Sequence, residues 1–260
     1  MCKLFRSFAI ALALLLTTVL IAQAGGWAVI TVDELPTQIT AGQALPIGFT
    51  VRQHGRTLRS DLKPIVRFDR ADAKESFQVT AQRQGGEGHY VAEIEFPNAG
   101  QWNWHVDIEQ FGMITQPMPM LTVQATPPVA APARAQPPSF AKILEFIGAI
   151  RRALAGRTSA TTAPVSLAVA NTALVDQVAL GKALFSAKGC VMCHAHSAVE
   201  AHPVWIGAEP PNLSQKTYGA EYLRVWLRDP HAVKPQTKMP KVQLNDREIE
   251  ALIAFLQAAR

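Results

Sequence analysis

The sequence contains few of the residues that mark several common protein classes. Three cysteines in 260 residues exclude a small domain built on disulfides. Charged residues make up 17% of the chain, below the usual quarter, so a solvated coiled coil is not expected. The formal net charge of +5 is too small to predict nucleic-acid binding. Hydrophobic residues are abundant, at 48%, which excludes general disorder, and the length predicts two domains.

Charge is also missing from most of the N-terminus. Lys3 and Arg6 precede an almost wholly apolar stretch at residues 8–21, and small residues follow at 22–24. This is the pattern of a secretory signal peptide over residues 1–24. An uncleaved membrane anchor stays open, because the uncharged stretch is long enough to cross a bilayer, which needs about 20 residues. In either case we expect export to the periplasmic, or extracytoplasmic, side of the membrane.

Residues 27–125 are predicted to form an all-β domain, and they contain no cysteine that could link its sheets. Short strands separated by turn formers are typical of a β-sandwich. The expected strands are residues 27–32, 45–51, 65–68, 76–81, 90–96, 102–108 and 118–123. Trp102 and Trp104 share one face of a strand and are predicted to lie in the core or on a sheet face.

Residues 126–170 are rich in proline and alanine, which predicts an extended linker. Within it, residues 140–157 have apolar side chains at helical spacing and a basic side. A lone helix of this length is marginal in water, so its apolar face is expected to dock. It would dock either on a domain of this chain or on a partner complex or membrane surface.

Residues 171–260 are predicted to be helical. The expected helices are residues 175–187, 220–228 and 246–259. Asn245 is a natural N-cap for the last helix, and Glu248 three residues later makes a variant of the capping box.

The sequence Cys190-Val191-Met192-Cys193-His194 carries the clearest chemical signal. The C-x-x-C-H spacing attaches c-type haem. Each cysteine can form a thioether with a haem vinyl group, and His194 supplies the nitrogen below the iron. Cys190 and Cys193 are the only cysteines beyond the predicted signal, so the motif uses every thiol that remains.

Three other interpretations of the motif are open. A thioredoxin-like C-x-x-C would follow a strand, whereas this one follows a predicted helix. A zinc site could combine Cys190 and Cys193 with His196 and His202, but it leaves His194 unexplained. Chance occurrence is the third.

Met239, in a loop 45 residues beyond His194, is the expected sixth iron ligand, because a loop methionine after a helix is the expected distal ligand of a compact haem domain. Its thioether would favour ferrous iron and raise the potential. His196, His202 and His231 are the rival ligands. Met239 could also be an ordinary surface-loop methionine.

Together these features resemble a class I (mono-haem) cytochrome c domain over residues 172–260. The residues that carry the resemblance are the helix with Gly181 and Phe185, the motif at 190–194, residues 210–213, residues 222–230, Met239-Pro240 and residues 246–256. The resemblance implies an all-α fold with one covalent haem c. It also implies that the first and last helices cross at Gly181, with Phe185 and Phe255 nearby.

The resemblance further implies the surroundings of the haem. The carbonyl of Pro211 would accept a hydrogen bond from His194 and orient its ring. The expected crevice residues are Leu213, Tyr218, Leu223, Trp226 and Leu227, for each of which plain core packing is the simpler alternative. Lysines that flank the predicted haem edge could steer an acidic redox partner or be ordinary solubilising residues: Lys182, Lys188, Lys216, Lys238 and Lys241.

The β-domain resembles, through residues 27–35, 44–53, 88–92 and 100–104, the exported Ig-like domains of the FixH/YtkA-like group. Such domains accompany respiratory and metal-transport systems, which raises a copper hypothesis. Met118 and Met120 would share a strand face, with Met113, His89 and His105 as neighbours, because thioethers suit cuprous ion. Core or edge packing is the simpler interpretation of these residues.

The sequence therefore predicts an exported, non-enzymatic electron carrier, with an Ig-like β-sandwich joined to a cytochrome c domain. Its partners would be proteins of a respiratory or photosynthetic chain. The alternatives are a haem-bearing subunit of a larger oxidoreductase complex, a haem sensor and a copper-handling protein.

Overall fold

The computed structural model describes residues 26–111, 116–127, 166–199, 210–214 and 217–258. The predicted signal at 1–24 and the basic helix at 140–157 lie outside these residues. So do His202, Lys216 and Met113. Within the described part of the chain, no helix has the length and apolarity needed to cross a membrane.

The N-terminal region consists of two five-stranded sheets, in agreement with the strand-rich domain that the sequence predicts. One sheet has the order β1-β3-β8-β7, with β4 paired to β3, and the other has the order β2-β10-β9-β5-β6. The strands are β1 Ala28–Val32, β2 Ile39–Thr40, β3 Ala44–Gln53, β4 Thr57–Leu58, β5 Ile65–Arg70, β6 Ser76–Thr80, β7 Gln82–Arg83, β8 His89–Glu95, β9 Gly100–Asp107 and β10 Leu121–Gln124. The short strands β2, β4 and β7 were not predicted.

One hydrophobic core joins the two sheets. Alternate residues of β3, β8 and β9 point into it, as the period of two in their sequences requires. Trp102 and Trp104 are both buried there, which confirms the expected placement of this pair. Their indole nitrogens donate to the carbonyls of Asn98 and Pro119. Burial of aromatic area therefore stabilises a domain that has no disulfide.

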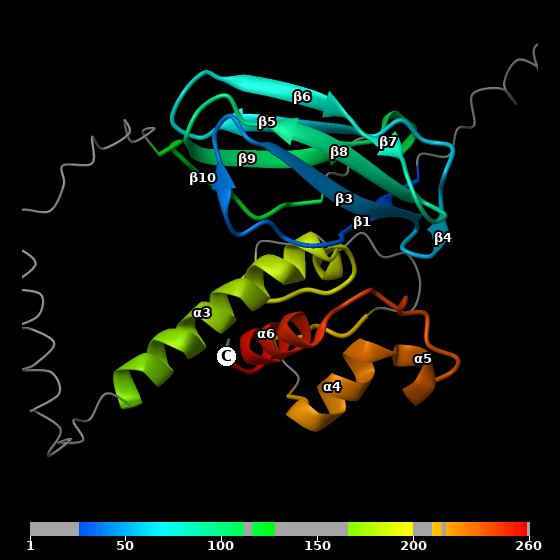
Figure 1. The fold of residues 1–260 in the computed structure, drawn as a ribbon. Helices are drawn as coiled ribbons and strands as arrows, with labels where there is room; N and C mark the ends of the chain where they lie inside the picture. Colours follow the sequence, from blue (N-terminus) through cyan, green and yellow to red (C-terminus); the bar gives the residue numbers. More distant parts are fainter. Residues whose placement is uncertain (1–25, 112–115, 128–165, 200–209, 215–216, 259–260) are drawn as a thin grey trace, which may run out of the picture.

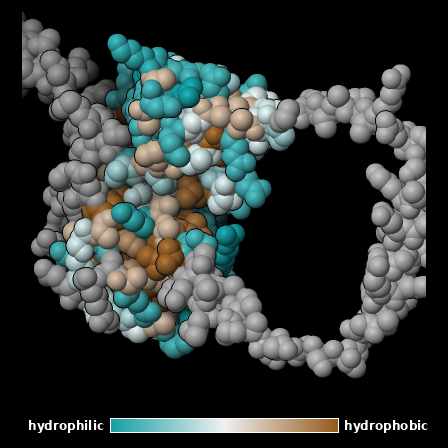
Figure 2. Space-filling view, turned by 90° about the vertical axis from the view of Figure 1, so that its left-hand side faces the viewer, coloured by the Kyte–Doolittle hydropathy of each residue, from teal (hydrophilic) through white to brown (hydrophobic). Residues whose placement is uncertain are grey.

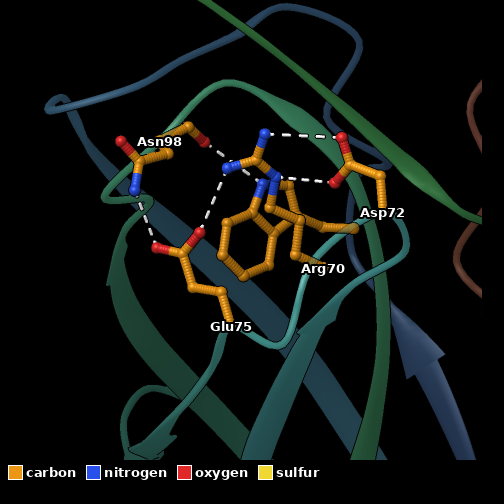
Figure 3. A network of polar contacts seen from close by, with 5 residues as sticks. Arg70, Asp72, Glu75 and Asn98 are labelled. Carbon is orange, nitrogen blue, oxygen red and sulfur yellow. Dashed lines mark hydrogen bonds and ion pairs between the residues drawn. The ribbon is translucent and has the colours of Figure 1, made fainter.

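Arg70 connects two turns at one end of this domain (Figure 3). Its guanidinium lies 2.7 Å from a carboxylate oxygen of Asp72 and 3.2 Å from one of Glu75. Glu75 also accepts a hydrogen bond from the side-chain amide of Asn98. Because Asp72 is largely exposed, this network positions the turns but adds little stability.

Helices make up the C-terminal region: α3 Ser166–Ala187, α4 Ala220–Arg228, α5 Pro230–Val233 and α6 Asp246–Ala258. The predicted bounds of the second and third expected helices are confirmed to within one residue. However, α3 begins nine residues earlier than expected, inside the range assigned to the linker. The capping box is confirmed: the Glu248 amide donates to Asn245 Oδ1, and the Asn245 amide donates to Glu248 Oε2.

The two regions pack directly against each other (Figure 1). Strand β1 lies over the C-terminal end of α3. Trp27 and Val29 belong to the hydrophobic core of the helical region and not to the core between the sheets. The buried side chain of Gln116 bonds the backbone N–H and C=O of Ile30 and the carbonyl of Ser186. The described regions therefore form one packed body.

Apolar surface is distributed unevenly over this body. In Figure 2 the upper, sheet half of the visible face is mostly teal, and brown side chains gather lower down, in the helical half and at the junction. Val175 of α3 and Val225 of α4 are among the large hydrophobic residues left exposed.

The methionine arrangement behind the copper hypothesis is wrong in one respect. Met118 and Met120 precede β10 instead of sharing a strand face, because the strand begins at Leu121. His89 and His105 lie on β8 and β9, which belong to different sheets. Among the described residues, no group of three or more histidine, cysteine or acidic side chains could hold a metal ion.

Candidate functional site

The C-x-x-C-H motif begins where α3 ends. Gly189 has a φ of 80°, a left-handed conformation that favours glycine, and a 3-10 turn at Cys190–Met192 follows. A Cβ atom on Gly189 would lie 2.3 Å from Cγ1 of Val29 and 2.9 Å from the carbonyl oxygen of Ile30. Glycine therefore permits both the turn and the close approach of β1, and the turn presents the two cysteines on one side.

Both cysteines are free thiols that line one cavity. Burial raises the pKa of Cys190 to about 12 and that of Cys193 to about 11. A catalytic C-x-x-C pair needs a lowered thiol pKa, so this environment disfavours thioredoxin-like chemistry.

His194 is held in one tautomer by the backbone. Its Nδ1 donates to the carbonyl oxygen of Pro211 at 3.0 Å. A carbonyl can only accept, so Nδ1 carries the proton and Nε2 keeps its lone pair. Burial also lowers the pKa of His194, which favours the neutral ring. The residue is therefore prepared to give a nitrogen lone pair to a metal.

Met239 lines the same cavity from the loop before α6. Its sulfur lies 3.1 Å from Nε1 of Trp226, and its amide donates to the Thr237 hydroxyl. The loop is tied to the preceding helices by Lys241, whose ammonium lies 2.9 Å from Asp229. That hydrogen bond holds the pKa of Asp229 below its usual value.

The cavity has a volume of about 750 Å³. It brings together every site residue that the sequence predicts: Cys190, Cys193, His194, Pro211, Leu213, Tyr218, Leu223, Trp226, Leu227 and Met239. Two reduced thiols, a neutral imidazole, a thioether and a largely apolar lining match the donor set and the apolar faces of haem c. The residues present thus fit the group that the motif predicts.

The cavity also has a wall that sequence reasoning missed. Val29, Thr31, Arg52 and Gly55 of the β-domain line it beside the cysteines. No sequence signal could have found them, because more than 130 residues separate them from the motif and the contact depends on how the domains dock.

The rival ligands occupy other environments. His196 is buried against Phe185 and Phe255, its Nδ1 accepts from the Ala198 amide, and burial lowers its pKa. His231 is exposed on α5. Neither residue lines the cavity.

One of the predicted steering lysines is not on the surface. Lys188 is 1% exposed and pairs with Glu248 at 2.8 Å, so both predictions for it, attraction of a partner and solubilisation of the surface, are wrong. Lys182, Lys238 and Lys241 are exposed, as that role requires.

Comparisons with known proteins identify the helical region. The sequence model of the family described as Cytochrome c matches residues 178–260. This part of the chain is therefore a cytochrome c domain, which holds haem c covalently and serves haem-based electron transfer.

A curated relative is a cytochrome c oxidase subunit 2 from Bacillus sp. (strain PS3), 32% identical over 92 residues. The match covers 31% of this chain, and the chain spans a quarter of that relative's length. Among solved structures, two variants of a superoxide reductase (neelaredoxin) from Ignicoccus hospitalis match at 12% identity with a TM-score of 0.26. Each match covers 41% of this chain and 86% of the other.

Proposed function

We propose that this chain, whose residues 178–260 form a cytochrome c domain, is an exported electron carrier with His194 and Met239 as axial iron ligands. The observation that carries the proposal is the single cavity lined by both cysteines, the hydrogen-bonded His194 and Met239. We expect no enzymatic turnover, because an iron held by both His194 and Met239 would leave no place for a substrate.

The chain's own residues supply what one-electron transfer needs. When bound, haem c supplies an iron that cycles between the ferric and ferrous states. His194 would give the lone pair of Nε2 to that iron, and its hydrogen bond from Nδ1 to the Pro211 carbonyl keeps the ring from rotating. Met239 contributes a thioether, which favours the ferrous state. Leu223, Leu227 and the other apolar residues of the wall exclude water from the site.

The ligand assignment is tested by replacing Met239 with alanine. We expect the variant to keep its covalent haem and to lose the methionine–iron charge-transfer band of the ferric spectrum, since the thioether is gone. Met118→Ala is the matched control, because Met118 packs against the β-domain core and does not line the cavity. An unchanged band in Met239→Ala would refute the assignment.

Export is proposed from the basic-then-apolar pattern of residues 1–24. N-terminal sequencing of protein from a fractionated host checks it. A periplasmic protein that begins at Gly25 supports a cleaved signal, whereas an intact N-terminus in the membrane fraction supports an anchor. Cytoplasmic holoprotein would contradict export.

A second candidate function is a haem-bearing subunit of a terminal oxidase or a similar complex. The similarity to a cytochrome c oxidase subunit 2 favours it. Native purification distinguishes the free electron carrier from the complex subunit. A stoichiometric complex with oxidase subunits supports the second candidate, and a freely exchanging monomer supports the carrier.

A further inference from the structure

The β-domain contributes a cation to the haem cavity, and that cation has no counter-ion in the described part of the chain. Arg52, near the end of β3, lines the cavity together with Thr31 and Gly55. Its guanidinium donates to the hydroxyl of Thr31 at 3.2 Å. Of the ion pairs among the described residues, none involves Arg52.

This position differs from those of three other arginines of the same domain. Arg59, Arg67 and Arg70 each lie within ion-pair distance of a carboxylate. Burial lowers the pKa of Arg52, and no carboxylate of the described residues opposes the effect. The guanidinium nevertheless stays protonated at physiological pH, because its usual pKa is so high. Arg52 therefore carries a full positive charge at a partly desolvated position.

The chain holds this charge in a fixed position relative to the cysteines. Gly189, which precedes Cys190, packs on Val29 of β1, and Arg52 is the cross-strand partner of Val29. Lys188 donates to the backbone carbonyl of Asp33, just after β1, at 2.7 Å. The wall that carries Arg52 is therefore fastened to the residues that attach the haem.

We propose that Arg52 is a positioning residue that raises the reduction potential of the haem through its charge. The inference rests on the haem site described above. Reduction adds one electron, taken from a one-electron donor protein, and lowers the charge of the haem iron by one. A nearby fixed cation stabilises that reduced state relative to the oxidised one, and low dielectric strengthens the effect. The β-domain thereby takes part in setting the potential.

The test is a mediated redox titration of the full-length holoprotein. Arg52→Gln is expected to lower the reduced-to-oxidised ratio at a fixed ambient potential by at least threefold, which is about 28 mV for one electron. Arg52→Lys keeps the charge and is expected to retain most of the wild-type ratio. Arg67→Gln, on an exposed face of the other sheet, is the matched control and is expected to change the ratio by less than about twofold.

Two further measurements separate charge from packing. The effect of Arg52→Gln should persist at about 0.5 M salt, because screening acts mainly on exposed charges. The methionine–iron band should stay intact in both Arg52 variants. The inference is overturned if Arg52→Gln changes the reduced-to-oxidised ratio no more than Arg67→Gln does. It is also overturned if Arg52→Lys lowers that ratio as much as Arg52→Gln. Absence of covalent haem in the wild-type protein would instead overturn the proposed function.

Discussion

At the scale of single residues, Lys188 is the point where three parts of the molecule meet. Its ammonium pairs with Glu248 of α6 and donates to the backbone carbonyls of Asp33 and Gln243. Glu248 is also buried, and it closes the capping box with Asn245. One side chain thus ties the turn before Cys190 to the last helix and to the β-domain.

Replacing Lys188 with alanine should be strongly destabilising. The change leaves the Glu248 carboxylate buried without its cation, which costs about 3–5 kcal/mol when one partner of a buried pair is removed. Urea unfolding followed by the haem absorption band measures the loss. Lys182→Ala, at an exposed lysine of α3, the helix that ends just before Lys188, is the control and should cost less than about 0.5 kcal/mol. Equal midpoints for the two variants would contradict the role given to Lys188.

Functional residues could be predicted where a short stretch of sequence is enough to identify them. The C-x-x-C-H motif has a fixed spacing with a specific use, and Met239 is set apart by its loop position. Lys188 shows where such reasoning fails. A lysine is normally exposed, and only the fold reveals the partner, Glu248, that makes its burial tolerable.

At the scale of elements, the contact between α3 and α6 organises the helical domain. A Cβ atom on Gly181 would lie 2.0 Å from the carbonyl oxygen of Ala251 and 2.6 Å from Cβ of Phe255. Phe185 and Phe255 pack one turn away, with ring centroids 5.6 Å apart. The ion pair between Arg224 and Glu250 joins α4 to α6, and both of these helices line the cavity.

Gly181→Ala should push the two helices apart. The new methyl group has backbone atoms as its neighbours, and these cannot move aside, so we expect a loss of about 3 kcal/mol in the free energy of unfolding. Denaturant titration with helical circular dichroism measures it. Gly86→Ala is the matched control, since nothing lies within 4 Å of its Cβ position among the described residues. Wild-type stability in Gly181→Ala would show that the helices do not meet there.

Helices α4 and α6 could be predicted almost to the residue, because both have apolar residues at helical spacing and α6 also has a capping box. The start of α3 could not be predicted, because residues 166–174 contain three possible N-cap residues, Ser166, Asn171 and Thr172, and no pattern that favours one of them as the starting point. The two-residue strands β2, β4 and β7 were missed because so short a pairing leaves no periodic pattern.

At the scale of the whole molecule, the β-domain contributes apolar side chains to the core of the haem domain. Trp27 and Val29 pack among helical residues, and Gln116 binds both sides. Composition predicted two domains and a linker between them, but no composition signal reports how two domains dock. The arrangement follows from complementary shape at Gly189 and Val29, which becomes visible only when both are folded.

We therefore expect the two domains to unfold together. Tryptophan fluorescence, to which the buried Trp102 and Trp104 of the β-domain contribute, and the haem absorption band of the helical domain should give one denaturant midpoint. Gln116→Ala should lower this common midpoint, because it leaves the backbone groups of Ile30 without partners. Two well-separated wild-type midpoints would show that the interface does not couple the domains.

The central claim is that Cys190 and Cys193 carry one covalent haem, and mass spectrometry of a tryptic digest tests it most directly. Protein made in a host that attaches c-type haem should yield the peptide of residues 189–216 with the mass of one haem added, even after acid and solvent extraction. Replacing both cysteines with serine should abolish the addition. A wild-type peptide at its bare mass would contradict the account.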